Sequence, residues 1–251
     1  MPFFIYGITQ SKPETPVLAK PIVKSDASLE YLECGDLYCI ISEVDDEDIL
    51  PVRRNLLGHS KILEEVMAEH TVIPMQFGIV MDHQSVIENI IKENASVLKN
   101  MLENLAGRIE VGLKVRLEEK EVFAEIAKDH PALQKTGATL NAKNENEVYY
   151  DRIELGRSVS KVIEEKRRDE LQSLINRVAP HVIKLVELET GDEFTIANLA
   201  LLVNKDKEQA LYNDIVELDA SQGERMHIKY VSPIPPYNFV SVQLNWQKDA
   251  A

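Results

Sequence analysis

Two histidines and two glutamates share one predicted helix, and their types come closest to a catalytic or metal-binding set. They stand in the segment GHSKILEEVMAEH as His59, Glu64, Glu65 and His70. Imidazole and carboxylate groups can hold a metal ion, but ligands on one helix face must recur every three, four or seven residues. His59 and His70 are eleven positions apart, which is roughly 16 Å along a helix that rises about 1.5 Å per residue. The spacing therefore favours a solvated helix face over a metal site.

Three other places carry residue types that could do chemistry, and each has a simpler structural interpretation. The acidic run at residues 45–48 could hold a cation or a partner, but acidic residues just before a helix usually cap it. His181 follows Pro180 and could act as an acid or base, whereas histidines near helix C-termini commonly donate to the last carbonyls. Trp246 could stack on a ligand or belong to a strand-like face with Phe239. We predict no catalytic residue, no cofactor-binding residue and no metal ligand.

Short motifs that mark large enzyme classes are missing from the sequence. It contains no G-x-x-x-x-G-K-[ST], no G-x-G-x-x-G after a strand, no H-E-x-x-H, no G-x-S-x-G and no calcium-binding loop. These motifs supply phosphate cradles, metal ligands and nucleophiles, so the enzyme classes that depend on them are disfavoured.

The two cysteines flank a predicted hairpin turn at Gly35-Asp36. A two-residue turn places Cys34 opposite Leu37 and Cys39 opposite Leu32, so the two thiols are not cross-strand partners. We expect no disulfide, and a single C-x4-C pair without a second pair does not make a zinc site.

Composition limits the classes of partner. The chain has 251 residues, of which 44% are hydrophobic and 28% charged, and its 28 basic against 42 acidic residues give a net charge of −14. This charge repels phosphate backbones and anionic lipids, so we predict neither a nucleic acid nor a membrane as partner. The N-terminal MPFFIYGITQ lacks the basic region of a signal peptide, and the expected location is the cytoplasm.

A first α+β domain is predicted for residues 1–107. Gly78 lies in the almost wholly apolar segment VIPMQFGIVM, which predicts one strand buried on both faces, with the glycine at a bulge or a close backbone approach. Alternating and helical periods predict strands at 3–9, 29–33, 37–44 and 72–81, and helices around 56–67 and 86–105.

A second domain is predicted for residues 108–232, joined to the first near Gly107. The predicted order is strand, helix, strand, strand, helix, strand, which is the βαββαβ order of a ferredoxin-like fold. A helical extension at about 119–148 follows the first strand, and Pro131 and Gly137 are expected to break any long helix there. A distant duplication of the first domain remains open. The elements are strands at 108–118, 183–190, 194–204 and 224–231 and helices at 155–178 and 207–218, with a hairpin at Gly191-Asp192.

A proline-rich tail at residues 233–251 follows the last predicted strand. Pro233, Pro235 and Pro236 fix an extended path. The tail is surplus to the βαββαβ set yet apolar, so it needs a surface. We predict that it packs between the two domains with Tyr237 and Phe239 as anchors; docking on a partner is the alternative.

Two segments carry a resemblance to a known family. The first is VIPMQFGIV, which follows HSKILEEVMAEH, and the second is PIPPYNFV near the C-terminus. They resemble the gas vesicle protein F/L family, whose members have L-P-x-R-F-G-T after a helix and G-P-W-P-P-Y-S-F near the end. The sequence departs from these motifs at Gln76, Ile79, Ser232, Ile234 and Asn238. The residues that match, and to which the resemblance assigns structural roles, are Pro74, Phe77, Gly78, Pro235, Pro236, Tyr237 and Phe239.

The resemblance implies a non-enzymatic, minor structural or assembly protein of gas vesicles. It would bind the major hydrophobic shell protein during wall formation, with other gas vesicle accessory proteins as further partners. It would be cytoplasmic and associated with the vesicle, on a side of the wall that the sequence leaves open. The alternative is a small-molecule-binding or enzymatic ferredoxin-like protein without a short motif. A polar cleft with converging titratable groups would favour this alternative, and a broad apolar patch would favour the assembly protein.

Overall fold

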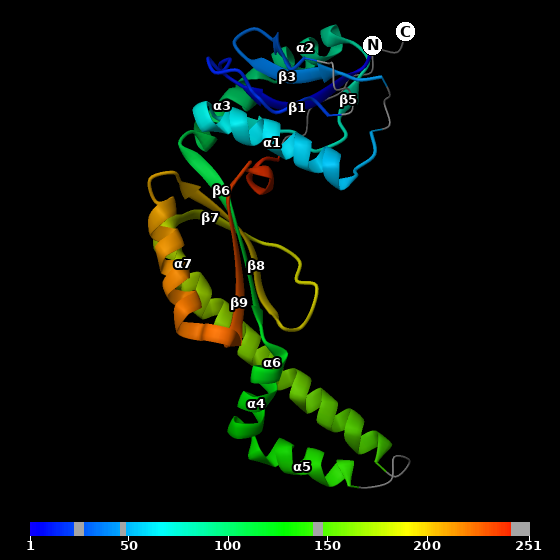
Figure 1. The fold of residues 1–251 in the computed structure, drawn as a ribbon, viewed down its shortest axis with the longest axis vertical. Coiled ribbons are helices and arrows are strands. Elements are labelled where there is room, and N and C mark those ends of the chain that lie inside the picture. The colour runs from blue at the N-terminus through cyan, green and yellow to red at the C-terminus, as the bar shows by residue number, and fades with distance from the viewer. Residues whose placement is uncertain (23–27, 46–48, 143–147, 242–251) are drawn as a thin grey trace. The chain divides into compact units, whose positions relative to one another are not determined.

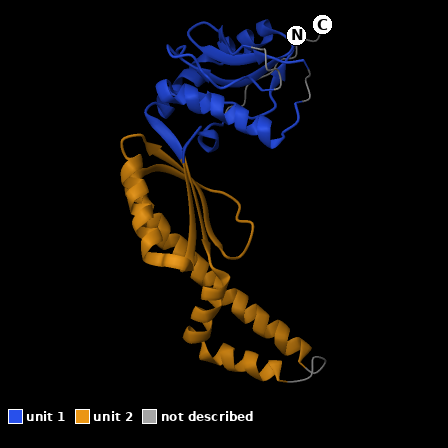
Figure 2. Ribbon diagram, in the orientation of Figure 1, with its two compact units in different colours: residues 1–110, 232–251 blue, residues 111–231 orange. Residues whose placement is uncertain are grey.

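The chain folds into two compact units. The computed structural model describes residues 1–22, 28–45, 49–142 and 148–241. Within these residues, seven α-helices and nine strands form a mixed α/β architecture (Figure 1). The first unit comprises residues 1–110 and the chain from Ser232 onward, and the second comprises residues 111–231 (Figure 2). The division at Glu110 and Val111 lies three positions after Gly107.

The first unit is built on a sheet whose central strand is covered on both faces. All seven residues of β1 (Phe3–Thr9) are buried. Helix α1 contacts β1 and β4, α2 contacts β2 and β5, and α3 contacts β4. The strand order is β2-β3-β1-β4, with β5 also paired to β1. The remaining elements are β2 (Glu30–Glu33), β3 (Tyr38–Glu43), α1 (Arg53–Glu69), β4 (Val72–Pro74), β5 (Val80–Met81), α2 (Gln84–Glu93) and α3 (Ala95–Leu105).

The hairpin of β2 and β3 has the predicted register. Cys39 pairs with Leu32, and the backbone N–H of Cys34 donates to the carbonyl of Leu37 at 2.8 Å. Both thiols are free and buried. Burial raises the pKa of the Cys34 thiol to about 11, which keeps it protonated and unreactive at neutral pH.

The prediction of one strand at 72–81 was wrong, because the segment makes two short pairings with β1 and turns outward between them. The N–H of Met75 donates to the carbonyl of Tyr6 at 2.9 Å, and the N–H of Ile5 donates to the carbonyl of Ile79 at 3.0 Å. Residues 76–78 therefore stand out from the sheet. Gly78 adopts φ 94°, and a Cβ there would meet nothing within 4 Å. The glycine is needed for its backbone angle and not for a close approach.

The second unit has a four-stranded sheet in the order β7-β8-β6-β9. Counted along the chain, this order is second, third, first, fourth, as for β2, β3, β1 and β4 in the first unit. Alternate residues of β6 are buried from Val111 to Leu117, as its sequence predicts, whereas Ile109, Glu110 and Val111 are all buried. The elements are β6 (Arg108–Leu117), α4 (Glu119–Asp129), α5 (Pro131–Asn141), α6 (Tyr149–Val178), β7 (Val182–Glu187), β8 (Thr195–Asn204), α7 (Glu208–Gln222) and β9 (Met226–Ile234).

Of the turn signals predicted in the second unit, the one at Gly137 was wrong and the one at Gly191-Asp192 was correct. Pro131 does begin a new helix, but Gly137 lies inside α5, where its Cβ position would be 3.6 Å from a methyl group of Leu155 on α6. The hairpin predicted at Gly191-Asp192 is present, since β7 and β8 pair antiparallel, and its loop spans residues 188–194. Within this loop, Oδ1 of Asp192 accepts the N–H groups of Phe194 and Thr195, both at 2.9 Å, and closes a local turn.

The start of α1 also differs from its prediction. The helix begins at Arg53 with Val52 as N-cap, without a side-chain cap and without an acidic residue in its first turn. Asp45 precedes the helix by eight positions and cannot cap it; residues 46–48 lie outside the described part of the chain. None of the helices in that part has both the length and the apolarity needed to cross a bilayer.

Candidate functional site: the aromatic cluster around His59

His59 lies at the centre of a buried cluster in the first unit and not on a solvated face. Together with Ile62, Leu63 and Val66 it forms the buried stripe of α1, and only 2% of its surface is exposed. Nε2 lies 3.0 Å from the carbonyl oxygen of Met75, so it carries the proton and donates. Nδ1 is buried, and none of the described residues offers it a hydrogen-bond partner. Burial lowers the pKa of His59 to about 4, which makes the ring neutral at pH 7.

Four aromatic rings surround this imidazole. Tyr6 and Tyr237 stack on it with centroid distances of 5.5 and 6.3 Å. Phe4 and Phe77 approach edge-on at 5.5 and 5.8 Å. Phe77 and Tyr237 come from the two segments that carry the family resemblance, so the cluster joins segments that are far apart in the sequence.

The C-terminal segment is held on this cluster by hydrogen bonds to Glu110. The backbone N–H of Asn238 donates to Oε2 at 2.9 Å and its side-chain Nδ2 donates to Oε1 at 2.6 Å. Glu110 is only 3% exposed, and burial raises the pKa of its carboxyl group, with the two Asn238 hydrogen bonds acting in the opposite direction. Tyr237 shares a side-chain hydrogen bond with Ser60, and burial raises the pKa of its phenol.

The seven residues of the family motifs all lie in the first unit. Pro74, Pro235 and Pro236 are buried. Phe77, Tyr237 and Phe239 are half-buried, and Gly78 is exposed in the turn. Trp246 lies outside the described residues.

Sequence reasoning missed the three polar residues of the cluster, His59, Glu110 and Asn238. A signal existed for His59, because positions 59, 62, 63 and 66 follow the spacing of a buried helix face. Glu110 stands on the polar side of an alternating strand, so nothing in the sequence indicates its burial.

Of the other residues in the predicted set, Glu65 and His70, which directly follows α1, hold a neighbouring stretch of chain. Nδ1 of His70 lies 2.8 Å from Oγ of Ser11. Glu65 accepts the backbone N–H groups of Leu18 and Ala19 at 2.6 and 2.9 Å. His59 and His70 thus take different partners, and no group of three or more His, Cys, Asp or Glu side chains among the described residues is arranged to hold a metal ion.

His181 also has a partner other than the predicted one. Its Nε2 lies 2.7 Å from Oδ2 of Asp214 on α7. The predicted contact with helix carbonyls is replaced by a link between the end of α6 and α7.

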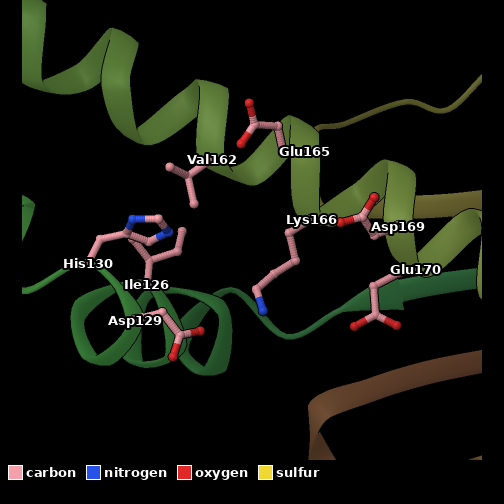
Figure 3. A pocket seen from close by; sticks show the side chains of 8 residues that line it. All are labelled: Ile126, Asp129, His130, Val162, Glu165, Lys166, Asp169 and Glu170. Atoms are coloured by element: carbon pink, nitrogen blue, oxygen red, sulfur yellow. The ribbon is translucent and has the colours of Figure 1, made fainter.

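A hollow of about 430 Å³ lies between α4 and α6 in the second unit. Figure 3 shows Lys166 reaching from α6 toward α4, and His130 beside Ile126 and Val162. Part of the lining is already paired: Nζ of Lys166 lies 2.6 Å from Glu125, and Glu170 pairs with Arg225. These ion pairs tie α4 and α6 to the chain that enters β9 at Met226. The lining residues are Ile126, Asp129, His130, Val162, Glu165, Lys166, Asp169 and Glu170.

The fold and the cluster define a two-unit α/β protein in which the motif residues Phe77 and Tyr237 both pack on His59 of α1. The chain belongs to the family described as gas vesicle synthesis protein GvpL/GvpF, whose sequence profile matches residues 2–241. The predicted family resemblance is thereby confirmed over nearly the whole chain.

Named relatives agree with this assignment. The chain is 26% identical over 246 residues to gas vesicle protein F of Nostoc sp. (strain PCC 7120 / SAG 25.82 / UTEX 2576), covering 95% of this chain and 98% of the relative. It is 22% identical to gas vesicle protein F1 of Halobacterium salinarum over 83% of this chain and 79% of the relative.

Two crystal structures share the fold. The chain is similar to the gas vesicle protein GvpF from Anabaena sp. PCC7120 with a TM-score of 0.80, at 24% identity over 96% of this chain and 99% of that one. It is also similar to GvpF from Microcystis aeruginosa with a TM-score of 0.79, at 22% identity over 96% of this chain and 99% of that one.

Proposed function

We propose that this protein is a non-enzymatic structural or assembly component of gas vesicles, which binds the major hydrophobic shell protein during wall formation. The observation that carries the proposal is the family match over residues 2–241. It is supported by the structural role of two motif residues in the first unit, where Phe77 and Tyr237 pack on His59. Other gas vesicle accessory proteins are further partners under this proposal.

The proposed location is the cytoplasm, at the gas vesicle, with the side of the wall left open. The net charge of −14 supports a protein partner over a nucleic acid or an anionic membrane, because both of these would repel the chain.

The second unit is, in this proposal, a ferredoxin-like βαββαβ domain with α4 and α5 inserted after its first strand. The strand order β7-β8-β6-β9 supports this topology. Packing of residues 233–251 between the two domains stays a prediction. The contacts described for Tyr237 and Asn238 are with His59, Ser60 and Glu110, all in the first unit.

A pull-down from the native host tests the proposal. The chain carries an affinity tag at its N-terminus, and the bound fraction is probed for the major shell protein while vesicles are forming. We expect the shell protein to be retained with the tagged chain and absent from an untagged control. Equal amounts in both fractions would contradict the proposal.

The alternative function, a small-molecule-binding or enzymatic ferredoxin-like protein, points to the hollow between α4 and α6 as the place for a ligand. A ligand that binds the folded state raises the melting temperature by mass action. We expect no upward shift with ATP, a nicotinamide dinucleotide or zinc, and a clear shift that disappears in Asp129→Asn would favour the alternative.

A further inference from the structure

An exposed apolar surface lies at the beginning of α1. Four large apolar side chains within eight positions are accessible to solvent: Leu50 is 68% exposed, Val52 49%, Leu56 41% and Leu57 59%. Scattered single apolar residues are normal on a protein surface, but a contiguous group usually marks a site of interaction. We call this group, with Arg53 and Arg54, the α1 patch.

The α1 patch is carried by a firmly held helix. One residue after Leu57, a Cβ at Gly58 would come within 2.9 Å of a methyl group of Ile22. The next residue, His59, is the buried centre of the aromatic cluster. The patch is therefore presented at a fixed position, which reduces the ordering entropy that binding would cost.

The charge of the patch is opposite to that of the whole chain. Arg53 and Arg54 are exposed and are the only charged residues between Ile49 and Leu57. They occupy the first turn of α1, which contains no acidic residue and lacks a side-chain cap. Free N–H groups at a helix start attract negative charge, so the backbone adds to the preference of the two guanidinium groups for carboxylates.

We infer that the α1 patch docks an apolar segment of the major shell protein that also carries carboxylates. The inference rests on the proposed function and specifies the surface that performs it. The leucines would supply the buried apolar area, and the arginines would fix the orientation of the segment by pairing with its acidic groups. A lipid surface is the less suitable occupant, because a chain with a net charge of −14 is repelled by anionic headgroups.

Two double variants of the full chain test the inference by pull-down with the shell protein. Leu56→Ser with Leu57→Ser removes apolar area, and Arg53→Glu with Arg54→Glu reverses the charge. The matched control is Val86→Ser with Val97→Ser, since these valines on α2 and α3 are 41% and 55% exposed. Melting temperatures are measured for all variants, and substitutions of exposed residues are expected to leave them nearly unchanged.

We expect each α1 variant to retain at least tenfold less shell protein than the wild type, because every 1.4 kcal/mol changes a binding constant tenfold and one buried leucine contributes about that much or more. The control is expected to bind like the wild type.

Each other outcome has a definite meaning. If the wild type fails to retain the shell protein, the proposed function fails. If the wild type binds and both α1 variants bind equally well, only the present inference is overturned. It is also overturned if sedimentation velocity shows that the wild type is a dimer and the α1 variants are monomers, because the patch would then bind a second copy of this chain. A membrane would be the partner of the patch instead if the wild type, but neither α1 variant, sedimented with lipid vesicles that contain anionic lipid at a mole fraction of about 0.3.

Discussion

His59 shows how a single side chain limits the conditions under which the first unit is stable. Its ring is enclosed by Phe4, Tyr6, Phe77 and Tyr237. In the part of the chain that the structure describes, Nδ1 has no hydrogen-bond partner. A proton added there would be a buried charge without a hydrogen-bond partner. The cluster therefore requires the neutral imidazole.

This requirement predicts acid sensitivity. The pKa of His59 is lowered from 6.5 to about 4 in the folded protein, so between these pH values the unfolded chain binds more protons than the folded one. Stability is full above pH 6.5 and falls as the pH is lowered toward 4, by a total on the order of 3 kcal/mol. In His59→Phe, the free energy of unfolding, measured by urea denaturation, should fall less between pH 7 and pH 4 than it does in the wild type. His130→Gln, at an exposed histidine, is the control and should keep the wild-type slope.

Glu110 makes a second prediction at the scale of a residue. Both carboxylate oxygens accept hydrogen bonds from Asn238. Glu110→Gln replaces one acceptor by an amide that donates, so at the buried Glu110 position one donor of the exposed Asn238 loses its partner. We expect a loss of about 1–3 kcal/mol in the free energy of unfolding. A double-mutant cycle with Asn238→Ala should show a coupling of about 1 kcal/mol; additive effects would mean that the hydrogen bonds contribute nothing specific.

Elements were predictable where local signals decide them. The hairpin at 30–43 follows from alternating apolar residues around Gly35-Asp36, and its register was predicted to the residue. The prediction of one strand at 72–81 failed because no local signal shows where a strand is interrupted. An apolar run indicates burial but not backbone continuity, and here the backbone leaves β1 after Met75 and returns at Ile79. Likewise, Gly137 weakens a helix intrinsically, but packing beside Leu155 overrides the propensity.

Gly78 allows the turn between β4 and β5 to be tested in isolation. A side chain at φ 94° is strained even though the space around Gly78 is open. Gly78→Ala should cost roughly 1–2 kcal/mol in the free energy of unfolding. Gly191→Ala provides a matched control, because that position is also open and has no positive φ. Equal effects of the two substitutions would show that the turn adopts another conformation in solution.

At the scale of the whole molecule, the two units share one strand order and differ in how the first two strands are connected. In the second unit, α4, α5 and α6 connect β6 to β7. In the first unit, the described residues between β1 and β2 (10–22 and 28–29) form no helix or strand. Glu65 on α1 holds this stretch through Leu18 and Ala19. The shared order supports a duplication, which the sequence left open because strand order depends on non-local hydrogen bonds and leaves no local signal. The same limit hid the cluster around His59, which is assembled from segments at both ends of the chain.

The C-terminal segment permits the last prediction, since the first unit is completed by residues that follow the second one. Removing residues 235–251 removes the ring of Tyr237 that stacks on His59. It also removes both Asn238 groups that donate hydrogen bonds to the buried Glu110. We expect the first unit to lose about 3 kcal/mol or more, which amide exchange would detect as lost protection in β1 and α1.

Strand β8, in the second unit, serves as internal reference and should keep its protection. A shorter deletion, of residues 242–251 alone, leaves every contact described for Tyr237 and Asn238 in place and should preserve protection throughout. If the longer deletion keeps β1 and α1 fully protected and abolishes only the binding of the shell protein, the segment is a partner-binding element and its structural role is refuted.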